Sequence, residues 1–417
     1  MVDTAFVGRL GTTALASLGV NAGIFGLAFF VFNFLANGTT PLVARAVGEN
    51  QRSQAGRIVV AGLGLAVVLG ALGTGALLLF ADPSAALMGA EEAELRRETL
   101  AYLTARAWAA PAVLLITAAN GAYRGYLDTK TPLWVALGLN AINLILDPIF
   151  IFGLGWGVAG AAWATVAAQW AGAIAFLALL YGRDRERFAI PVALPQAAEV
   201  KHLLRVGSVL SIRTLALVFT LTAATAVATR LGEEVVAAHQ VAWQLWLMFA
   251  LFVDAFAYTA QSLVADHEGA GRPDEARAVA DRLLQWGLGI GVLLGLGVWL
   301  AAPLWPVFFD LEPAVAALFA TVLPIVAVMQ PLNALVFVGD GIFMGARRFG
   351  WLAGAMLFAT VPTLVGLWWV LEQELDLRVL WWCLVMLIGL RGLSLAVVYF
   401  GPKTILPRDP VPPSPTE

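Results

Sequence analysis

Polar side chains that suit a small cation follow one face of an otherwise apolar segment in the first half of the chain. Asn140, Asn143 and Asp147 are spaced i, i+3 and i+7, which places them on one face if the segment is helical. Pro148 follows directly and removes one backbone hydrogen bond, so a carbonyl is left free near the carboxylate. Thr165, in the next apolar segment, adds a hydroxyl. These oxygens together predict a site for a hard cation, or for a proton carried on a desolvated carboxylate. The alternative is a polar stripe that only joins two helices.

Further charged residues lie in other apolar segments, where a charge is costly and indicates function by default. They are Asp3, Arg106, Arg213, Asp254, Asp340 and Arg391. Two readings of the second-half set, Arg213, Asp254 and Asp340, are open: a structural network that neutralises itself, or the lining of a cavity for a cationic compound. Asn33 joins the cavity candidates because it aligns with Asp254 in the internal repeat described below. For Arg106 and Arg391, a structural ion pair or a snorkelling side chain is the simplest explanation.

The composition requires lipid as the solvent for much of this chain. Of its 417 residues, 60% are hydrophobic and 13% are charged, and the mean hydropathy is +0.83. A soluble domain is about half apolar and about a quarter charged. The net charge of −3 argues against nucleic acid as a partner, and the single cysteine, Cys383, excludes a disulfide within one chain. No phosphate-binding loop, zinc-protease motif or serine-hydrolase motif occurs, so we expect neither an enzyme nor a bound cofactor.

Eleven apolar segments reach the roughly 20 residues that a membrane-spanning helix needs. They cover about residues 13–44, 55–81, 98–123, 132–153, 158–181, 203–229, 235–264, 280–302, 314–345, 350–371 and 379–400. Their apolar residues are continuous instead of alternating, which favours helices over strands. Lys and Arg gather in every second loop, which places these loops and the C-terminus in the cytoplasm.

The two halves of the chain repeat one another in sequence. Matches include Arg9-Leu10-Gly11 with Arg230-Leu231-Gly232, Leu42-Val43-Ala44 with Leu263-Val264-Ala265, and, one residue out of register, Pro111, Gly121 and Gly125 with Pro331, Gly341 and Gly345. Both halves have the same order of apolar segments, which predicts a parallel repeat about an axis along the membrane normal. The paired Gly-x-x-x-Gly motifs predict close helix packing. Met1 aligns with Thr222, so Val200–Leu221 has no counterpart, and we expect the first half to lack most of one helix.

These patterns predict an all-α integral membrane protein with eleven complete spans and a remnant of the first helix. The expected parts are an N-terminal bundle at 1–182, a cytoplasmic linker loop at 183–198, a C-terminal bundle at 199–401 and a disordered cytoplasmic tail at 402–417.

Several stretches of the chain carry a family resemblance: Val2–Gly11, Arg106–Pro111, Gly121–Asp128 with Thr131-Pro132, Asn143–Gly153 with Asp147-Pro148, Ala237–Gln240 and Asp340-Gly341. Together they resemble the multidrug and toxic compound extrusion (MATE) family, in particular its DinF-like branch. The resemblance covers essentially the whole chain. It implies a MATE fold of two six-helix bundles around a central cavity, and exchange of organic compounds for inward H⁺ or Na⁺. It also implies a cation site in the first half made of Asp3, Asn143, Asp147 and Thr165.

The resulting functional prediction is a cation-coupled antiporter, monomeric, in the inner cell membrane, that exports small organic compounds. We expect the cargo to be cationic or amphipathic, and four acids against three arginines at membrane depth favour a cationic compound. A flippase for lipid-linked precursors is the alternative, and a basic cavity would favour it. A membrane scaffold has no need of carboxylates inside the bilayer.

Overall fold

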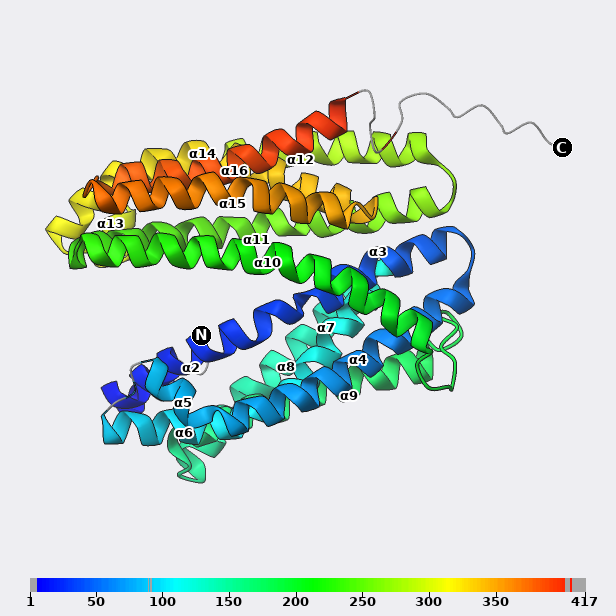
Figure 1. Cartoon of the computed structure of the whole chain (residues 1–417). Coiled ribbons are helices and arrows are strands. Elements are labelled where there is room, and N and C mark those ends of the chain that lie inside the picture. Colours follow the sequence, from blue (N-terminus) through cyan, green and yellow to red (C-terminus); the bar gives the residue numbers. More distant parts are fainter. Residues whose placement is uncertain (1–5, 89, 91, 402–405, 407–417) are drawn as a thin grey trace. The chain divides into compact units, whose positions relative to one another are not determined.

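The described part of the chain is helical and contains no strand (Figure 1). The computed structural model describes residues 6–88, 90, 92–401 and 406. Its first elements are a short 3₁₀ turn η1 (Gly8–Leu10), α2 (Thr12–Phe30), a 3₁₀ turn η2 (Val31–Asn33), α3 (Phe34–Gly48), α4 (Arg52–Leu79), α5 (Ala81–Leu87), α6 (Ala93–Ala107), α7 (Ala110–Gly125), α8 (Lys130–Pro148), a π-helical turn η3 (Ile149–Gly153), α9 (Gly157–Ala178) and a π-helical turn η4 (Leu179–Arg183). They are followed by α10 (Ala197–Leu231), α11 (Glu233–Gly269), α12 (Pro273–Leu300), α13 (Trp305–Phe308), α14 (Pro313–Gly345), α15 (Phe349–Glu372) and α16 (Leu377–Phe400).

The helices have the length and surface of a multi-pass membrane protein. Among the described residues, nine are long and apolar enough to cross a bilayer, and α6 with α7 form a tenth crossing bent by 50°. The remaining expected span, 13–44, is divided by η2 into α2 and α3. Large apolar side chains remain outside: Leu72, Leu300 and Val328 are 65%, 76% and 72% exposed, as lipid-facing residues should be. The expected all-helical membrane fold is confirmed, although two of the eleven segments are interrupted.

Pro111 accounts for the bend between α6 and α7. Proline has no N–H, so the carbonyl of Ala107 lacks its helical donor. The hydroxyl of Thr74 on α4 donates to this carbonyl at 2.8 Å, and the indole N–H of Trp170 on α9 donates to the carbonyl of Trp108 at 3.0 Å. Two neighbouring helices therefore hold the break in place.

The chain forms two compact units that divide within α10, Met1–Gly207 and Ser208–Glu417. The expected linker loop, 183–198, lies just before this division. The first turns of α10 pack on the N-terminal unit: Glu199 pairs with Arg57 of α4 at 3.1 Å, and Val206 lies against Gly38 of α3. We describe each unit by itself.

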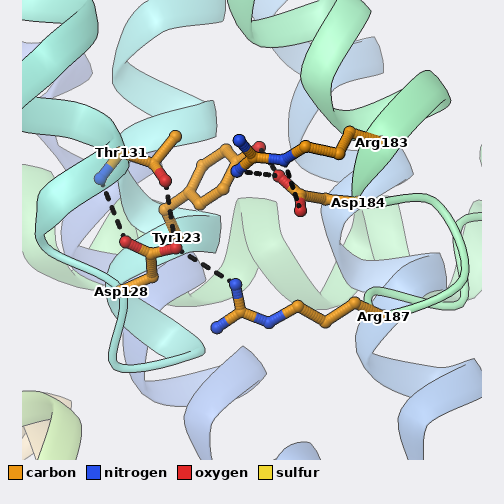
Figure 2. Close-up of polar contacts among 6 residues, drawn as sticks. All are labelled: Tyr123, Asp128, Thr131, Arg183, Asp184 and Arg187. Atoms are coloured by element: carbon orange, nitrogen blue, oxygen red, sulfur yellow. Dashed lines mark hydrogen bonds and ion pairs between the residues drawn. The ribbon is translucent and has the colours of Figure 1, made fainter.

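The segment after α9 is tied to the end of α7 by polar contacts, which Figure 2 shows. We call residues 183–190 the α9 clasp. Asp184 accepts a hydrogen bond from the Tyr123 hydroxyl at 2.9 Å. Arg187 donates to Asp128 at 3.1 Å, and Asp128 also accepts from the N–H and the hydroxyl of Thr131, each at 3.0 Å. Burial raises the pKa of Asp128, but the contacts from Thr131 and Arg187 outweigh it and hold that pKa below its ordinary value. Their stabilising contribution is therefore present at neutral pH and is lost only as the pH falls through this lowered pKa.

Apolar contacts bury the middle of the α9 clasp. The Phe188 side chain is fully buried, with its ring 3.9 Å from that of Tyr126 and 4.9 Å from that of Tyr123, measured between centroids. Gly56 of α4 lies so close to the carbonyl of Ala189 that a Cβ at this position would overlap it. Residues 183–190, the first part of the expected linker loop, are thus packed against the N-terminal unit.

We expect Gly56→Val to release the α9 clasp, because the added side chain has no space beside the backbone of Ala189. The cost should be about 1–3 kcal/mol, as for other overpacked sites. Limited trypsin digestion should then cleave after Arg185 or Arg187 faster than in the unmodified protein. Gly75→Val on the same helix is the control, because no atom lies within 4 Å of its Cβ position. Equal cleavage rates in both variants would contradict the packing argument.

Equivalent positions of the two halves share unusual backbone conformations, which confirms the sequence repeat. Positive φ angles occur in equivalent pairs: Gly11 (125°) with Gly232 (136°), Asn50 (59°) with Gly271 (69°), and Leu127 (57°) with Arg347 (56°). Residues other than glycine rarely adopt such angles, so three matched pairs indicate the same turns in both units.

The same helix pairs pack closely in both units. Gly121 and Gly125 let α7 approach α3, where a Cβ would lie 3.0 Å from Ala36 and 2.7 Å from Val43, respectively. Their repeat counterparts, Gly341 and Gly345, do the same for α14 against α11. The two Gly-x-x-x-Gly motifs therefore have the packing role that the sequence predicted.

Candidate cation site

The structure brings Asn143, Asp147 and Thr165 together between α8 and α9. The side-chain amide of Asn143 donates to Oδ1 of Asp147 at 3.1 Å and also lies 3.4 Å from the Thr165 hydroxyl. Thr165 in turn donates to the carbonyl of Ala161 at 3.0 Å. Asp147 is fully buried and Asn143 is 8% exposed. A buried carboxylate grouped with an asparagine amide and a threonine hydroxyl has the ligand chemistry of a site for H⁺ or Na⁺.

The burial pattern of α8 is the reverse of that in a soluble protein. Asn143 and Asp147 are the buried residues of this helix, whereas Leu137, Leu144 and Ile145 are 52%, 52% and 60% exposed. A helix that turns its leucines to lipid and its carboxylate inward places the charge where only protein can solvate it. The polar residues of α8 are therefore positioned by the lipid-facing apolar residues around them.

The end of α8 departs from regular helical geometry beside the site. The helix ends at Pro148 and continues as the π-helical turn Ile149–Gly153. A proline removes one helical hydrogen bond, and π-helical turns are frequent at functional sites. The free carbonyl that the sequence expected beside Asp147 stays a prediction.

Asn140 does not join the site, although the sequence placed it on the same stripe. It is exposed, and its side-chain amide donates to the carbonyl of Ala136 one turn earlier, at 2.7 Å. The reason is that no part of the N-terminal unit covers the side chain of Asn140, whereas Asn143 and Asp147 are buried against it. Helical spacing fixes the face of a residue but not how far along the helix the neighbours extend.

Asp3 lies outside the described residues, so its membership of the site stays a prediction. Val7, four residues later, belongs to a buried apolar cluster that also contains Ile151 and Ala161. Ile151 lies four residues after Asp147, and Ala161 accepts the hydrogen bond of Thr165. The chain just after Asp3 is thus packed against the two segments that carry the site.

In the C-terminal unit, Asp340 of α14 forms ion pairs with two arginines. Arg213 of α10 and Arg391 of α16 both donate to its Oδ2 atom, the latter at 2.5 Å. Asp340 is 5% exposed and Arg391 is 3% exposed. The structural ion pair expected for Arg391 is confirmed, but the sequence did not identify its partner, since nothing in the residue spacing connects α16 to α14.

The other two cavity candidates, Asp254 and Asn33, are less buried than Asp340. Asp254 is partly buried on α11, and Asn33 is exposed in η2. The roles of Asn33, Arg213, Asp254 and Asp340 toward a cargo remain predictions. The geometry shows that Arg213 and Asp340 act on each other, which the network reading expected.

Comparison with known proteins identifies the family. The profile of the MatE family matches residues 1–149 and 210–369. The chain belongs to the MatE family. Protein DETOXIFICATION 44, chloroplastic, of Arabidopsis thaliana is 34% identical over 402 residues, which cover 91% of this chain and 76% of that protein. The probable multidrug resistance protein NorM of Burkholderia mallei is 30% identical, over 92% of this chain and 84% of its own. DNA damage-inducible protein F of Escherichia coli K12 is 28% identical, over 96% and 87%.

Solved structures agree with the fold of this MatE protein. A multidrug resistance MATE family transporter of the MOP superfamily in an outward-facing conformation superposes with a TM-score of 0.86. The match has 22% sequence identity and covers 94% of this chain and 88% of that one. Family and fold together make the protein a multi-pass membrane transporter of the multidrug efflux family and not an enzyme.

Proposed function

We propose that this MatE protein is a secondary antiporter that exports organic compounds by alternating access in exchange for H⁺ or Na⁺ bound at Asn143, Asp147 and Thr165. One observation carries the proposal: the buried residues of α8 are a carboxylate and the amide that hydrogen-bonds to it. A buried carboxylate in a bilayer is costly unless a proton or a cation neutralises it, so its loading state changes the energy of the unit that contains it.

Coupling requires that the ion bind one cavity orientation more tightly than the other, because equal affinity shifts no equilibrium. Asp147 satisfies the chemical part of this requirement, since it is fully buried and accepts a hydrogen bond from the amide of Asn143, which also contacts Thr165 of α9. In this proposal Asp3 completes the site and shares the ion. In this proposal the protein acts as a monomer in the inner cell membrane. Its C-terminus lies in the cytoplasm, an orientation that the distribution of Lys and Arg favours.

Transport by the purified full chain in proteoliposomes tests this function. With ethidium as a fluorescent organic cation, we expect movement driven by an H⁺ gradient or by an Na⁺ gradient, each imposed separately, and collapse of the movement when an ionophore removes the gradient. A protein-dependent flux that neither gradient changes would overturn the coupling proposal.

The Arg213–Asp340–Arg391 cluster favours one second candidate, the flippase for lipid-linked precursors. Two guanidinium groups on one carboxylate leave this cluster with a positive charge, which suits an anionic headgroup better than a cationic drug. The same proteoliposomes separate the two functions: a flippase moves a fluorescent polyprenyl phosphate between leaflets without an ion gradient and leaves ethidium untouched.

A further inference from the structure

A second polar contact lies one helical turn from the cation site along α9. Gln169 follows Thr165 by four residues, so both side chains emerge on the same face of this helix. The guanidinium of Arg106, at the end of α6, donates to Oε1 of Gln169 at 2.5 Å. Its Cζ atom lies 5.4 Å from the ring centroid of Phe25 on α2. Asp147, Asn143, Thr165, Gln169 and Arg106 thus form one polar row through the N-terminal unit.

Arg106 is a cation whose described contacts are all neutral. Within the part of the chain that the structure describes, its contacts are an amide oxygen and an aromatic face, and no carboxylate lies within ion-pair distance. α2 and α9 contain no ionisable residue. On α6 the other charges, Glu94, Arg96, Arg97 and Glu98, lie at least two turns before Arg106, and Tyr102 lies one turn before it. Among the ionisable residues of α2, α6 and α9, Arg106 is therefore the one that contacts the face of α9 that carries Thr165.

The position of this charge is fixed by the break between α6 and α7. The carbonyls of Ala107 and Trp108, the two residues that follow Arg106, are held by Thr74 of α4 and Trp170 of α9. In this unit Gly70 of α4 also packs against Pro111, where the helix is broken. The equivalent contact of the second unit, Gly291 of α12 against Pro331, occurs within the unbroken helix α14. The N-terminal unit thus has a break at Arg106 that its repeat lacks.

We propose that Arg106 is a positioning and specificity-determining residue that sets the affinity of the Asp147 site for the coupling ion. The proposal rests on the proposed function. A fixed positive charge favours the bare carboxylate and weakens binding of H⁺ or Na⁺, which lets the site release its ion after each cycle. One helical turn and the reach of a glutamine separate the guanidinium from the carboxylate by a distance on the order of 10 Å. At an effective dielectric constant of about 20, a unit charge at that distance changes a binding constant about tenfold.

Equilibrium binding to the full chain in lipid nanodiscs tests this role without requiring transport. The two measurements are binding of ²²Na⁺ and, separately, proton uptake on acidification. In each, binding to the site is defined as the part of the signal that is lost in Asp147→Asn. We expect Arg106→Gln to lower the half-saturating ion concentration about tenfold. Arg106→Lys should stay within about twofold of the unmodified protein, because the charge is kept. Gln169→Leu should do the same, since it removes the hydrogen bond but not the charge. Arg97→Gln, with a side chain 73% exposed, is the control for a screened charge on the same helix.

The outcomes are distinguishable. Ion binding that Asp147→Asn removes but Arg106→Gln leaves unchanged would overturn the role of Arg106 and leave the proposed function standing. An equal shift in Gln169→Leu and Arg106→Gln would also overturn it, because the contact and not the charge would then matter. Binding that persists in Asp147→Asn would overturn the cation site itself and, with it, this inference.

Discussion

Asp147→Asn is expected to abolish ion-driven export while the protein still folds and inserts into the membrane. Asparagine has nearly the same shape and can still hydrogen-bond to Asn143, so the packing of α8 on α9 should persist. The asparagine side chain cannot carry a proton or balance the charge of Na⁺, so the ion gradient can no longer drive transport through binding at this residue. We expect gradient-driven flux to fall at least about a hundredfold, since raising the free-energy barrier to transport by only about 2.7 kcal/mol has that effect. The measurement is ethidium flux in proteoliposomes under the gradient that drives the unmodified protein.

Asn140→Ala is the matched control for this prediction. Asn140 lies on the same helix, two turns from Asp147, but its side chain is exposed and bonds only within α8. Its removal should leave flux within about twofold, as surface substitutions usually do. Full flux in Asp147→Asn would remove Asp147 from the coupling site. Equal losses in both variants would show that α8 as a whole, and not its carboxylate, limits transport.

The sequence predicted the helices well, because lipid demands long apolar runs with internally bonded backbones. The repeat also followed from the sequence, and it led directly to the glycine pairs that pack α7 on α3 and α14 on α11. The breaks were harder to predict. Pro331 lies within a continuous helix, whereas its counterpart Pro111 accompanies a bend of 50°, because Thr74 and Trp170 supply donors to the freed carbonyls. Those donors come from other helices and leave no trace in the local sequence.

The candidate site shows the same limit. Asn143, Asp147 and Thr165 could be grouped from spacing and residue type, because α8 and α9 are adjacent in the chain and pack together. The partnership of Arg391 with Asp340 could not, since it depends on how two helices far apart in sequence are rotated against each other. The α9 clasp was assigned to a loop because its residues are charged. Its burial depends on Phe188 and on a missing Cβ at Gly56.

The second large effect is expected from Asp340→Asn, which should destabilise the C-terminal unit. The change leaves the guanidinium groups of Arg213 and Arg391 beside a neutral amide, with Arg391 only 3% exposed. Breaking a buried ion pair on one side typically costs about 3–5 kcal/mol, because the remaining charge is uncompensated. Thermal unfolding in detergent, followed by size-exclusion chromatography, should show a clear loss of folded protein at temperatures that the unmodified chain survives.

Two further variants establish that the uncompensated charge is the cause. Adding Arg391→Gln to Asp340→Asn removes one of the stranded cations, so the double variant should be more stable than Asp340→Asn alone, the reverse of additive damage. Asp82→Asn breaks the Arg96–Asp82 pair, whose atoms are also 2.5 Å apart but whose Asp82 side chain is 57% exposed. Water replaces the lost partner there, so little change is expected. If Asp340→Asn were no more harmful than Asp82→Asn, the cluster would have to be open to water and free to bind an anionic cargo, and its structural role would be excluded.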